Sequence, residues 1–256
     1  MRVLVLGNSH AATLRLGFPA IAMAYPGVAL SFWGLPGAAF GKARVGADGR
    51  MAADASDALS LRKVTSWNET ETVDLTAYDR VFLVGLRYGY RPALQLMRRL
   101  QPLDWGRRDR AQGVSEGFLR ASVRGLIDAS LAEQTARTPF DERFVALAAP
   151  YPAASVTVVD GQLYEPITAV VSGLPRAADL CALYEDELTA AHAAAGLAFV
   201  PQPARTVSAP FLSDPAFLAE PARDGRHMNA DYGLAAFADL MAHFPDRQEN
   251  DHALGP

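Results

Sequence analysis

Short runs of β-branched and other apolar residues alternate along this chain with longer amphipathic stretches, and this alternation constrains the fold more than any other feature. The pattern is typical of parallel strands joined by crossover helices. The expected strands are Arg2 to Leu6, Val28 to Trp33, Arg80 to Val84, Arg143 to Ala148 and Leu197 to Val200. The sequence therefore predicts an α/β fold whose parallel sheet has about five strands.

Three of the amphipathic stretches repeat apolar residues at intervals of three and four, the spacing that places them on one face of a helix. We interpret these faces as parts of the core rather than as cofactor-binding segments, since a helix that covers a sheet needs such a stripe. The repeats are Leu119, Val123, Leu126 and Ile127; Leu180, Leu183, Tyr184 and Leu188; and Phe237, Leu240, Met241 and Phe244.

Chain length and the placement of these segments predict the domain organisation. With 256 residues the chain is long enough for one well-buried α/β domain, which we expect over residues 1–245, followed by a polar tail at 246–256. Residues 34–79 break the pattern as an irregular insertion, with a short hairpin expected over residues 60–75. Because this insertion follows the carboxyl end of the second strand, we expect it near the ligand crevice of an open α/β sheet.

Composition and charge argue against several classes of function. The 24 basic and 28 acidic residues give a formal net charge of -4, without the basic excess typical of nucleic-acid-binding proteins, and we interpret the local cluster Arg107, Arg108 and Arg110 as a solvated loop. The single cysteine, Cys181, rules out an intrachain disulfide and a multi-cysteine zinc site. The sequence has no Walker loop and no complete Gly-x-Gly-x-x-Gly fingerprint, and its histidines lack a metal-binding spacing. We therefore expect no cofactor and no metal.

The distribution of apolar residues bears on location. Met1 and Arg2 lead directly into a strand-length apolar run, without the extended apolar region of a secretory leader. No segment approaches the roughly 18 uninterrupted apolar residues of a membrane span. We therefore expect a cytoplasmic protein that binds neither membranes nor nucleic acid. The sequence leaves the oligomeric state open.

The first expected strand runs into the turn Gly7-Asn8-Ser9-His10, and helix-like spacing follows at once. A serine in this position projects from the carboxyl edge of the sheet, where free backbone N–H groups and the helix dipole stabilise negative charge. Ser9 is therefore a candidate nucleophile. The alternative is that Ser9 or Asn8 only caps the helix. We interpret His10 as a packing residue or as a residue at the edge of the substrate.

Near the other end of the chain, Asp224 and His227 stand three residues apart, just before the helix with the clearest apolar face. In a turn, this spacing allows the carboxylate to accept a hydrogen bond from the imidazole or the adjoining backbone, which fixes the ring while its other nitrogen faces outward. A histidine held in this way can act as a general base toward a serine. The alternative is a capped helix start with an incidental histidine.

Together, the two ends resemble the SGNH or GDSL-like hydrolase family. Its first block, a Gly-Asp-Ser turn after the first strand, is matched by Gly7-Asn8-Ser9, and its last block, Asp-x-x-His before the terminal helix, is matched by residues 224–227. The resemblance implies a three-layer α/β/α sandwich with flavodoxin-like architecture and a catalytic triad of Ser9, His227 and Asp224. Asn8 replaces the family's usual aspartate, which keeps a hydrogen-bonding side chain but loses its charge.

The middle blocks of the family pattern are matched less well. The second block supplies a glycine whose backbone N–H binds an oxyanion; Gly37 is the implied residue and Gly34 its rival, although both also suit plain turns. In the third block, Gly-x-Asn-Asp, the chain reads Gly85-Leu86-Arg87-Tyr88, with arginine in place of the oxyanion asparagine. Arg87 either replaces that donor, binds an anionic substrate, pairs with an acidic neighbour, or marks a site without hydrolytic activity.

These observations lead to a functional prediction with alternatives. The resemblance implies a serine esterase that hydrolyses small acyl esters, such as O-acetyl groups on carbohydrate, without a cofactor. An O-acyl transferase using the same site and a non-catalytic ligand-binding module with the same fold both remain open. The turn Pro150-Tyr151-Pro152 lies on the same sheet edge as Ser9 and is a candidate substrate contact, although prolines there also end the strand.

Overall fold

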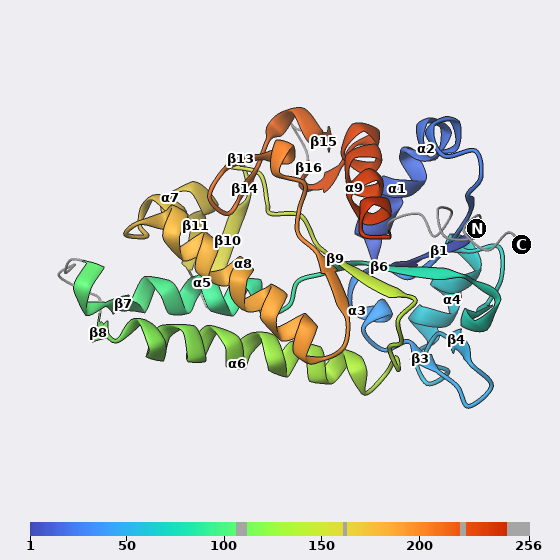
Figure 1. The fold of residues 1–256 in the computed structure, drawn as a ribbon, viewed down its shortest axis with the longest axis horizontal. Helices are drawn as coiled ribbons and strands as arrows, with labels where there is room; N and C mark the ends of the chain where they lie inside the picture. The colour runs from blue at the N-terminus through green and yellow to red at the C-terminus, as the bar shows by residue number, and fades with distance from the viewer. Residues whose placement is uncertain (106–111, 161–162, 221–223, 245–256) are drawn as a thin grey trace, which may run out of the picture.

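A sheet of five parallel strands forms the centre of the computed structural model, which describes residues 1–105, 112–160, 163–220 and 224–244 (Figure 1). The strands are β1 (Arg2–Gly7), β2 (Ala29–Gly34), β6 (Arg80–Leu86), β9 (Phe144–Ala148) and β12 (Ala198–Val200). Their order across the sheet is β12, β9, β6, β1, β2, so the chain starts inside the sheet and adds strands on both sides. All five predicted strands are confirmed, and their ends differ from the predicted ends by two residues at most.

Helices cover both faces of this sheet and confirm the predicted three-layer α/β/α architecture. One face carries α1 (Ala12–Leu16), α2 (Phe18–Ala24) and α9 (Ala230–Ala242). The core on the other side includes residues of α3 (Gly37–Phe40), α4 (Ala58–Trp67), α5 (Tyr90–Arg99), α6 (Glu116–Thr135), α7 (Ile167–Ser172) and α8 (Ala177–Ala194). The three predicted apolar stripes lie on α6, α8 and α9 and face the core, except that Phe244 packs against the core from just beyond the end of α9.

Neighbouring residues of the central strands serve different layers, because successive side chains of a strand point to opposite faces. In β1, Val3 and Val5 pack in the core beneath α1 and α9, whereas Leu4 and Leu6 pack in the core on the opposite side. All four side chains have no exposed surface. A strand buried on both faces needs a continuous apolar run, which explains why β1, β6 and β9 are recognisable in the sequence; the edge strands β2 and β12 are only partly buried.

The segment between β2 and β6 folds into regular structure. It contains α3, α4 and a small antiparallel sheet of β3 (Arg44–Val45), β4 (Arg50–Ala52) and β5 (Thr72–Asp74). The hairpin predicted over residues 60–75 is wrong, since half of that stretch belongs to α4. The helix is started by Asp57, whose Oδ1 accepts hydrogen bonds from the N–H groups of Leu59 and Ser60. This cap stands just before the predicted hairpin and favours the helix.

Four short strand pairs complete the described structure. They are β7 (Leu100–Pro102) with β8 (Gln112–Val114), β10 (Thr157–Asp160) with β11 (Leu163–Pro166), β13 (Val207–Ala209) with β14 (Leu212–Ser213), and β15 (Leu218–Glu220) with β16 (Asp224–Met228). The predicted tail at 246–256 and the cluster Arg107, Arg108 and Arg110 lie outside the described residues. None of the described helices is both long enough and apolar enough to span a membrane.

Two glycines allow α1 and α9 to approach each other closely, and the two helices lie side by side above the sheet (Figure 1). A Cβ atom on Gly233 would lie 2.3 Å from the carbonyl oxygen of Thr13, and a Cβ atom on Gly17 would lie 2.9 Å from that of Ala230. The Thr13 hydroxyl also donates a hydrogen bond to the Met228 carbonyl at 3.4 Å. Because α1 follows the turn after β1 and α9 follows β16, this contact holds the two ends of the chain together.

Replacing Gly233 with alanine should therefore push α9 away from α1 and lower the free energy of unfolding by about 1–3 kcal/mol. The matched control is Gly125→Ala in α6, where an added Cβ meets nothing within 4 Å. There the substitution should raise the free energy of unfolding by up to about 1 kcal/mol, because alanine is the better helix former. Urea denaturation of both variants measures the difference, and equal midpoints would contradict the close contact.

Candidate active site

Ser9 stands at the carboxyl end of β1, in a turn that is held by its neighbour. Asn8 precedes the 3-10 helix Ser9–Ala11, and its Oδ1 accepts a hydrogen bond from the His10 N–H at 3.0 Å. The Asn8 Nδ2 donates to the Gly85 carbonyl at 2.6 Å, which ties the turn to the end of β6. Of the two residues considered as the cap, Asn8 is therefore the one that caps. The Ser9 hydroxyl is left free for another partner.

That partner is His227, which lies 218 positions away in the sequence. Its Nε2 is 2.9 Å from the Ser9 Oγ, and its Nδ1 is hydrogen-bonded to Asp224 Oδ2. Asp224 and His227 both belong to β16, and Asn229 caps the following helix α9 by accepting from the Tyr232 N–H at 3.1 Å. The structure thus brings together the three residues that the sequence singled out as nucleophile, base and carboxylate.

The hydrogen bonds of His227 define the roles of its two nitrogens. Asp224 has no proton to give when it is ionised, so the Nδ1 must donate to it and the Nε2 lone pair accepts from the Ser9 hydroxyl. Burial opposes the ionisation of Asp224, but the hydrogen bonds from His227 and from the Arg226 backbone N–H outweigh it and hold the pKa of the carboxyl below its usual value. An ionised carboxylate on Nδ1 is what a serine-activating histidine requires.

His10 packs against this arrangement as a neutral ring. Its ring centroid is 5.2 Å from that of His227, and only 6% of its surface is exposed. Burial, followed by the positive charge of Arg87, lowers the pKa of His10 to about 3. His10 is therefore uncharged at neutral pH and supports the face of the His227 ring, in agreement with its interpretation as a packing residue.

The two glycines considered as oxyanion donors differ in their free hydrogen-bonding capacity. The Gly34 N–H donates to Asn68 Oδ1 at 2.8 Å, and the Gly34 carbonyl accepts from Asn68 Nδ2 at 2.9 Å. Gly34 is thus tied to the end of α4, and its N–H is not available to a ligand. Gly37 begins α3 with a positive φ of 40°, and the first N–H groups of a helix have no partner within the helix. Gly37 is the better candidate.

Arg87 lies just beyond the end of β6, close to the turn that holds Ser9. Gly85, two residues earlier, has a φ of +92°, and a Cβ atom there would lie 2.3 Å from Asn8 Oδ1 and 2.9 Å from the His10 Cβ. The Arg87 side chain is exposed, and no carboxylate among the described residues forms an ion pair with it. The alternative in which Arg87 pairs with an acidic neighbour therefore has no support among the described residues.

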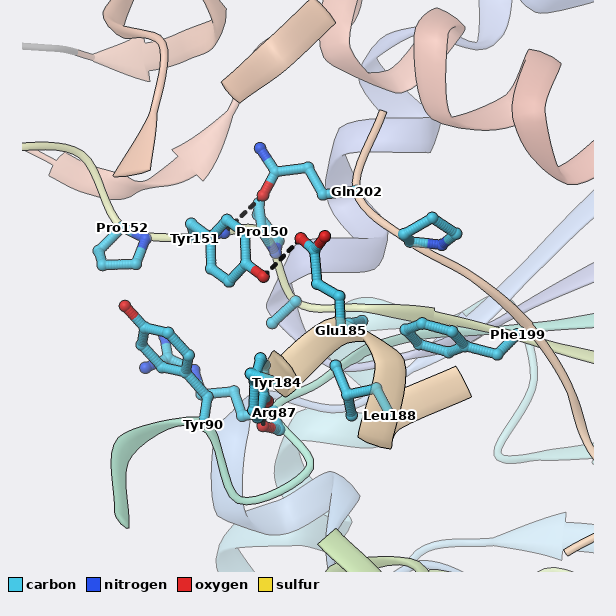
Figure 2. A pocket seen from close by; sticks show the side chains of 13 residues that line it. Arg87, Tyr90, Pro150, Tyr151, Pro152, Tyr184, Glu185, Leu188, Phe199 and Gln202 are labelled. Carbon is cyan, nitrogen blue, oxygen red and sulfur yellow. Dashed lines mark hydrogen bonds between the residues drawn. The ribbon is translucent and has the colours of Figure 1, made fainter. Parts of the chain in front are cut away.

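A pocket with aromatic walls opens beside Arg87 at the same edge of the sheet (Figure 2). It encloses about 460 Å³, part of it open to solvent, between the loops after β6, β9 and β12 and helix α8. Tyr90, Tyr184 and Phe199 contribute to its walls, together with the predicted turn Pro150-Tyr151-Pro152. The Tyr151 hydroxyl donates to Glu185 Oε1 at 2.8 Å. Neither Ser9 nor His227 lines this pocket, so it adjoins the Ser9 and His227 pair rather than containing it.

Several residues around the site were not found from the sequence. Asn68 lies 34 positions from its partner Gly34, and no local pattern links the two. Glu185 has a weak local signal, since it is the acidic residue one turn after the buried Cys181 on a helix that covers the sheet. Arg226 had the clearest signal, because it lies inside the Asp-x-x-His block that the sequence had already singled out.

No protein-family model and no curated protein matches this chain. Among solved structures, the chain is similar to an extracellular lipase from Streptomyces rimosus, with 15% identity, 95% of this chain and 100% of the lipase covered, and a TM-score of 0.41. It is also similar to a GDSL-like lipase from Bacteroides thetaiotaomicron VPI-5482 (12% identity, 94% and 86% covered, TM-score 0.37). A third similar structure is the periplasmic domain of a lipopolysaccharide acetyltransferase from Salmonella ser. Paratyphi A, with 10% identity, 94% of this chain and 82% of that chain covered, and a TM-score of 0.43.

Replacing Asn8 with aspartate should destabilise the protein, even though aspartate is the residue of the family pattern. The carboxylate still accepts from the His10 N–H, but it has no proton for the Gly85 carbonyl, and two oxygens would face each other. We expect the free energy of unfolding to fall by about 1–3 kcal/mol at neutral pH. The deficit relative to wild type should shrink on acidification, when the carboxyl regains a proton. A pH-independent deficit in denaturation experiments would contradict this account.

Acidification should also destabilise the wild-type protein through His10. Because the pKa of His10 is about 3 in the folded state and about 6.5 in the unfolded chain, the unfolded chain binds the extra proton between these values. The His10 contribution is therefore complete above pH 6.5 and is lost toward pH 3, with a slope approaching about 1.4 kcal/mol per pH unit. His10→Gln should show a shallower pH dependence of unfolding. An unchanged slope would contradict the burial of a neutral ring.

Proposed function

We propose that this protein is a serine-dependent acyl-ester hydrolase of the SGNH or GDSL-like type. The observation that supports the proposal is the hydrogen-bonded series Asp224, His227 and Ser9, assembled from opposite ends of the chain at the carboxyl edge of a parallel sheet. A purely structural role explains the arrangement of these three side chains less well, because Asn8 already caps the 3-10 helix Ser9–Ala11 and Asn229 already caps α9. The proposed substrates are small acyl esters, including O-acetyl groups on carbohydrate.

In the proposed reaction, the Ser9 Oγ attacks the ester carbonyl carbon while the His227 Nε2 takes the hydroxyl proton. The carbonyl oxygen becomes an oxyanion, and collapse of the tetrahedral intermediate breaks the bond to the alcohol, which leaves with the proton from His227. The acyl group is then held on Ser9. A water molecule gives its proton to His227 and attacks the acyl-enzyme, which releases the acid and restores the Ser9 hydroxyl.

Charge stabilisation in this reaction would come from groups that are already in place. Asp224 stabilises the imidazolium that forms on His227 and keeps its Nδ1 protonated. For the oxyanion, we propose the backbone N–H groups of Ser9 and Gly37, which both stand at the start of helical turns where N–H groups lack a partner. No step requires a cofactor.

Removing any member of the proposed triad should abolish most of the turnover of p-nitrophenyl acetate. We expect Ser9→Ala and His227→Ala to lower kcat by at least about 10³-fold, and Asp224→Asn to lower it by about 10³- to 10⁴-fold, because the histidine loses the partner that fixes its tautomer. Ser122→Ala, which removes a hydroxyl from the outer surface of α6, is the control and should keep wild-type turnover.

Labelling with a fluorophosphonate, located by peptide mass spectrometry, provides an independent readout of the nucleophile. Modification at Ser9 in the wild type and none in His227→Ala would support the proposal. Equal background rates in all folded variants, without labelling at Ser9, would overturn it and leave the ligand-binding alternative. Turnover that appears only when an acceptor alcohol is added would identify an acyl transferase.

A further inference from the structure

Two guanidinium groups next to the candidate triad have no carboxylate partner among the residues that the structure describes. Elsewhere in the described chain, arginines such as Arg120, Arg143 and Arg176 form ion pairs at 2.6–3.2 Å. Arg87 and Arg226 form none with any described residue, although both residues keep part of their surface open to solvent. A guanidinium offers several N–H donors in a fixed plane that matches a carboxylate or a phosphate.

These two arginines belong to different parts of the fold. Arg226 belongs to β16 and directly precedes His227. Arg87 follows the end of β6, whose Gly85 contacts both Asn8 and His10. The pKa values of the neighbouring groups reflect this proximity. Burial is the largest cause that lowers the pKa of His10, and the charges of both arginines lower it further. The pKa of Arg87 is lowered first by burial and then by the charge of Arg226. Two positive charges therefore converge on one small region.

The nearby carboxylates do not neutralise this region, because each has another partner. Asp224 accepts hydrogen bonds from His227 and from the Arg226 backbone N–H rather than from an arginine side chain. Glu185 lines the aromatic pocket and accepts from the Tyr151 hydroxyl (Figure 2). Unpaired like charges repel each other, and among the described residues no carboxylate pairs directly with either guanidinium to offset this repulsion.

We propose that Arg87 and Arg226 bind a negatively charged group, a carboxylate or a phosphate, on the alcohol portion of the ester substrate. This inference rests on the proposed hydrolase function. The alcohol portion is the one concerned because His227 returns its proton to the leaving oxygen, so the leaving group lies against His227. The charges of Arg87 and Arg226 both act on His10, whose ring packs against that of His227. Arg87 also lines the aromatic pocket, which gives the remainder of the alcohol an apolar surface.

Matched aryl acetates test the proposal. The anionic substrates are 4-acetoxybenzoate and 4-acetoxyphenyl phosphate, and the neutral reference is methyl 4-acetoxybenzoate; all three deliver the same acetyl group to Ser9. The measured quantity is the ratio of kcat/KM for each anionic ester to that for the neutral ester. Each of Arg87→Gln and Arg226→Gln should lower this ratio by about tenfold, as expected for the loss of one hydrogen bond to a charged group. Comparing the two anions distinguishes carboxylate from phosphate recognition.

Arg50→Gln is the control for the loss of one positive charge, because Arg50 lies on β4 in the small antiparallel sheet and bonds to Thr72. The ratio of kcat/KM for the anionic esters to that for the neutral ester should be the same in Arg50→Gln as in the wild type. If Arg87→Gln lowers kcat/KM for all three esters equally, Arg87 acts on the oxyanion and the proposal is wrong. A ratio that falls equally in Arg50→Gln would also overturn it, since net charge alone would then explain the selectivity.

The proposal can fail independently of the hydrolase function. In Ser9→Ala, calorimetry would compare the binding of the products 4-hydroxybenzoate and methyl 4-hydroxybenzoate, with no turnover needed. Tighter binding of the anion, lost in Ser9→Ala/Arg226→Gln, would support an anion site even if the wild type hydrolysed no ester. Equal binding of both products would overturn the anion site even if the wild type were an active esterase.

Discussion

The close contact between α1 and α9 is the constraint on which the candidate site depends. Ser9 and His227 each stand just before one of these helices. Their side chains can form a hydrogen bond because Gly17 and Gly233, which lack a Cβ atom, allow the two helix backbones to lie in contact. Strand pairing alone would leave this separation unspecified, because β16 is not part of the central sheet. Hence Gly17 and Gly233, which contact no reacting atom, set the distance between the proposed nucleophile and its base.

Asparagines cap the turn at Ser9 and the start of α9, which leaves the side chains of the proposed triad free. At the first turn, Asn8 supplies both an acceptor for the His10 N–H and a donor for the Gly85 carbonyl. At the start of α9, Asn229 accepts from the Tyr232 N–H. A serine that capped its own helix would have its oxygen committed to a backbone N–H, and it would be a poorer partner for His227. The same division of roles occurs at both ends of the site.

The parts of this arrangement that could be predicted are those whose signals are local in sequence. The inner strands β1, β6 and β9 are buried on both faces and therefore form continuous apolar runs, whereas the edge strands β2 and β12 are only partly buried. The motifs around Ser9 and His227 each span four residues. The predicted hairpin is instead partly the helix α4, which is capped by Asp57 just before it. The bond between Asn68 and Gly34 could not be predicted, since it depends on how α4 docks against β2.

In the proposed mechanism, the charges around His227 would link substrate selection to catalysis. Formation of the imidazolium places a positive charge near Arg87 and Arg226, and Asp224 is the carboxylate that directly offsets it. His10 adds no further charge, because burial keeps its ring neutral. A substrate that carries its own negative charge would reduce the repulsion between the arginines and the imidazolium as well as bind to the arginines. In such a site, the group that the protein recognises also favours protonation of the base during attack by Ser9.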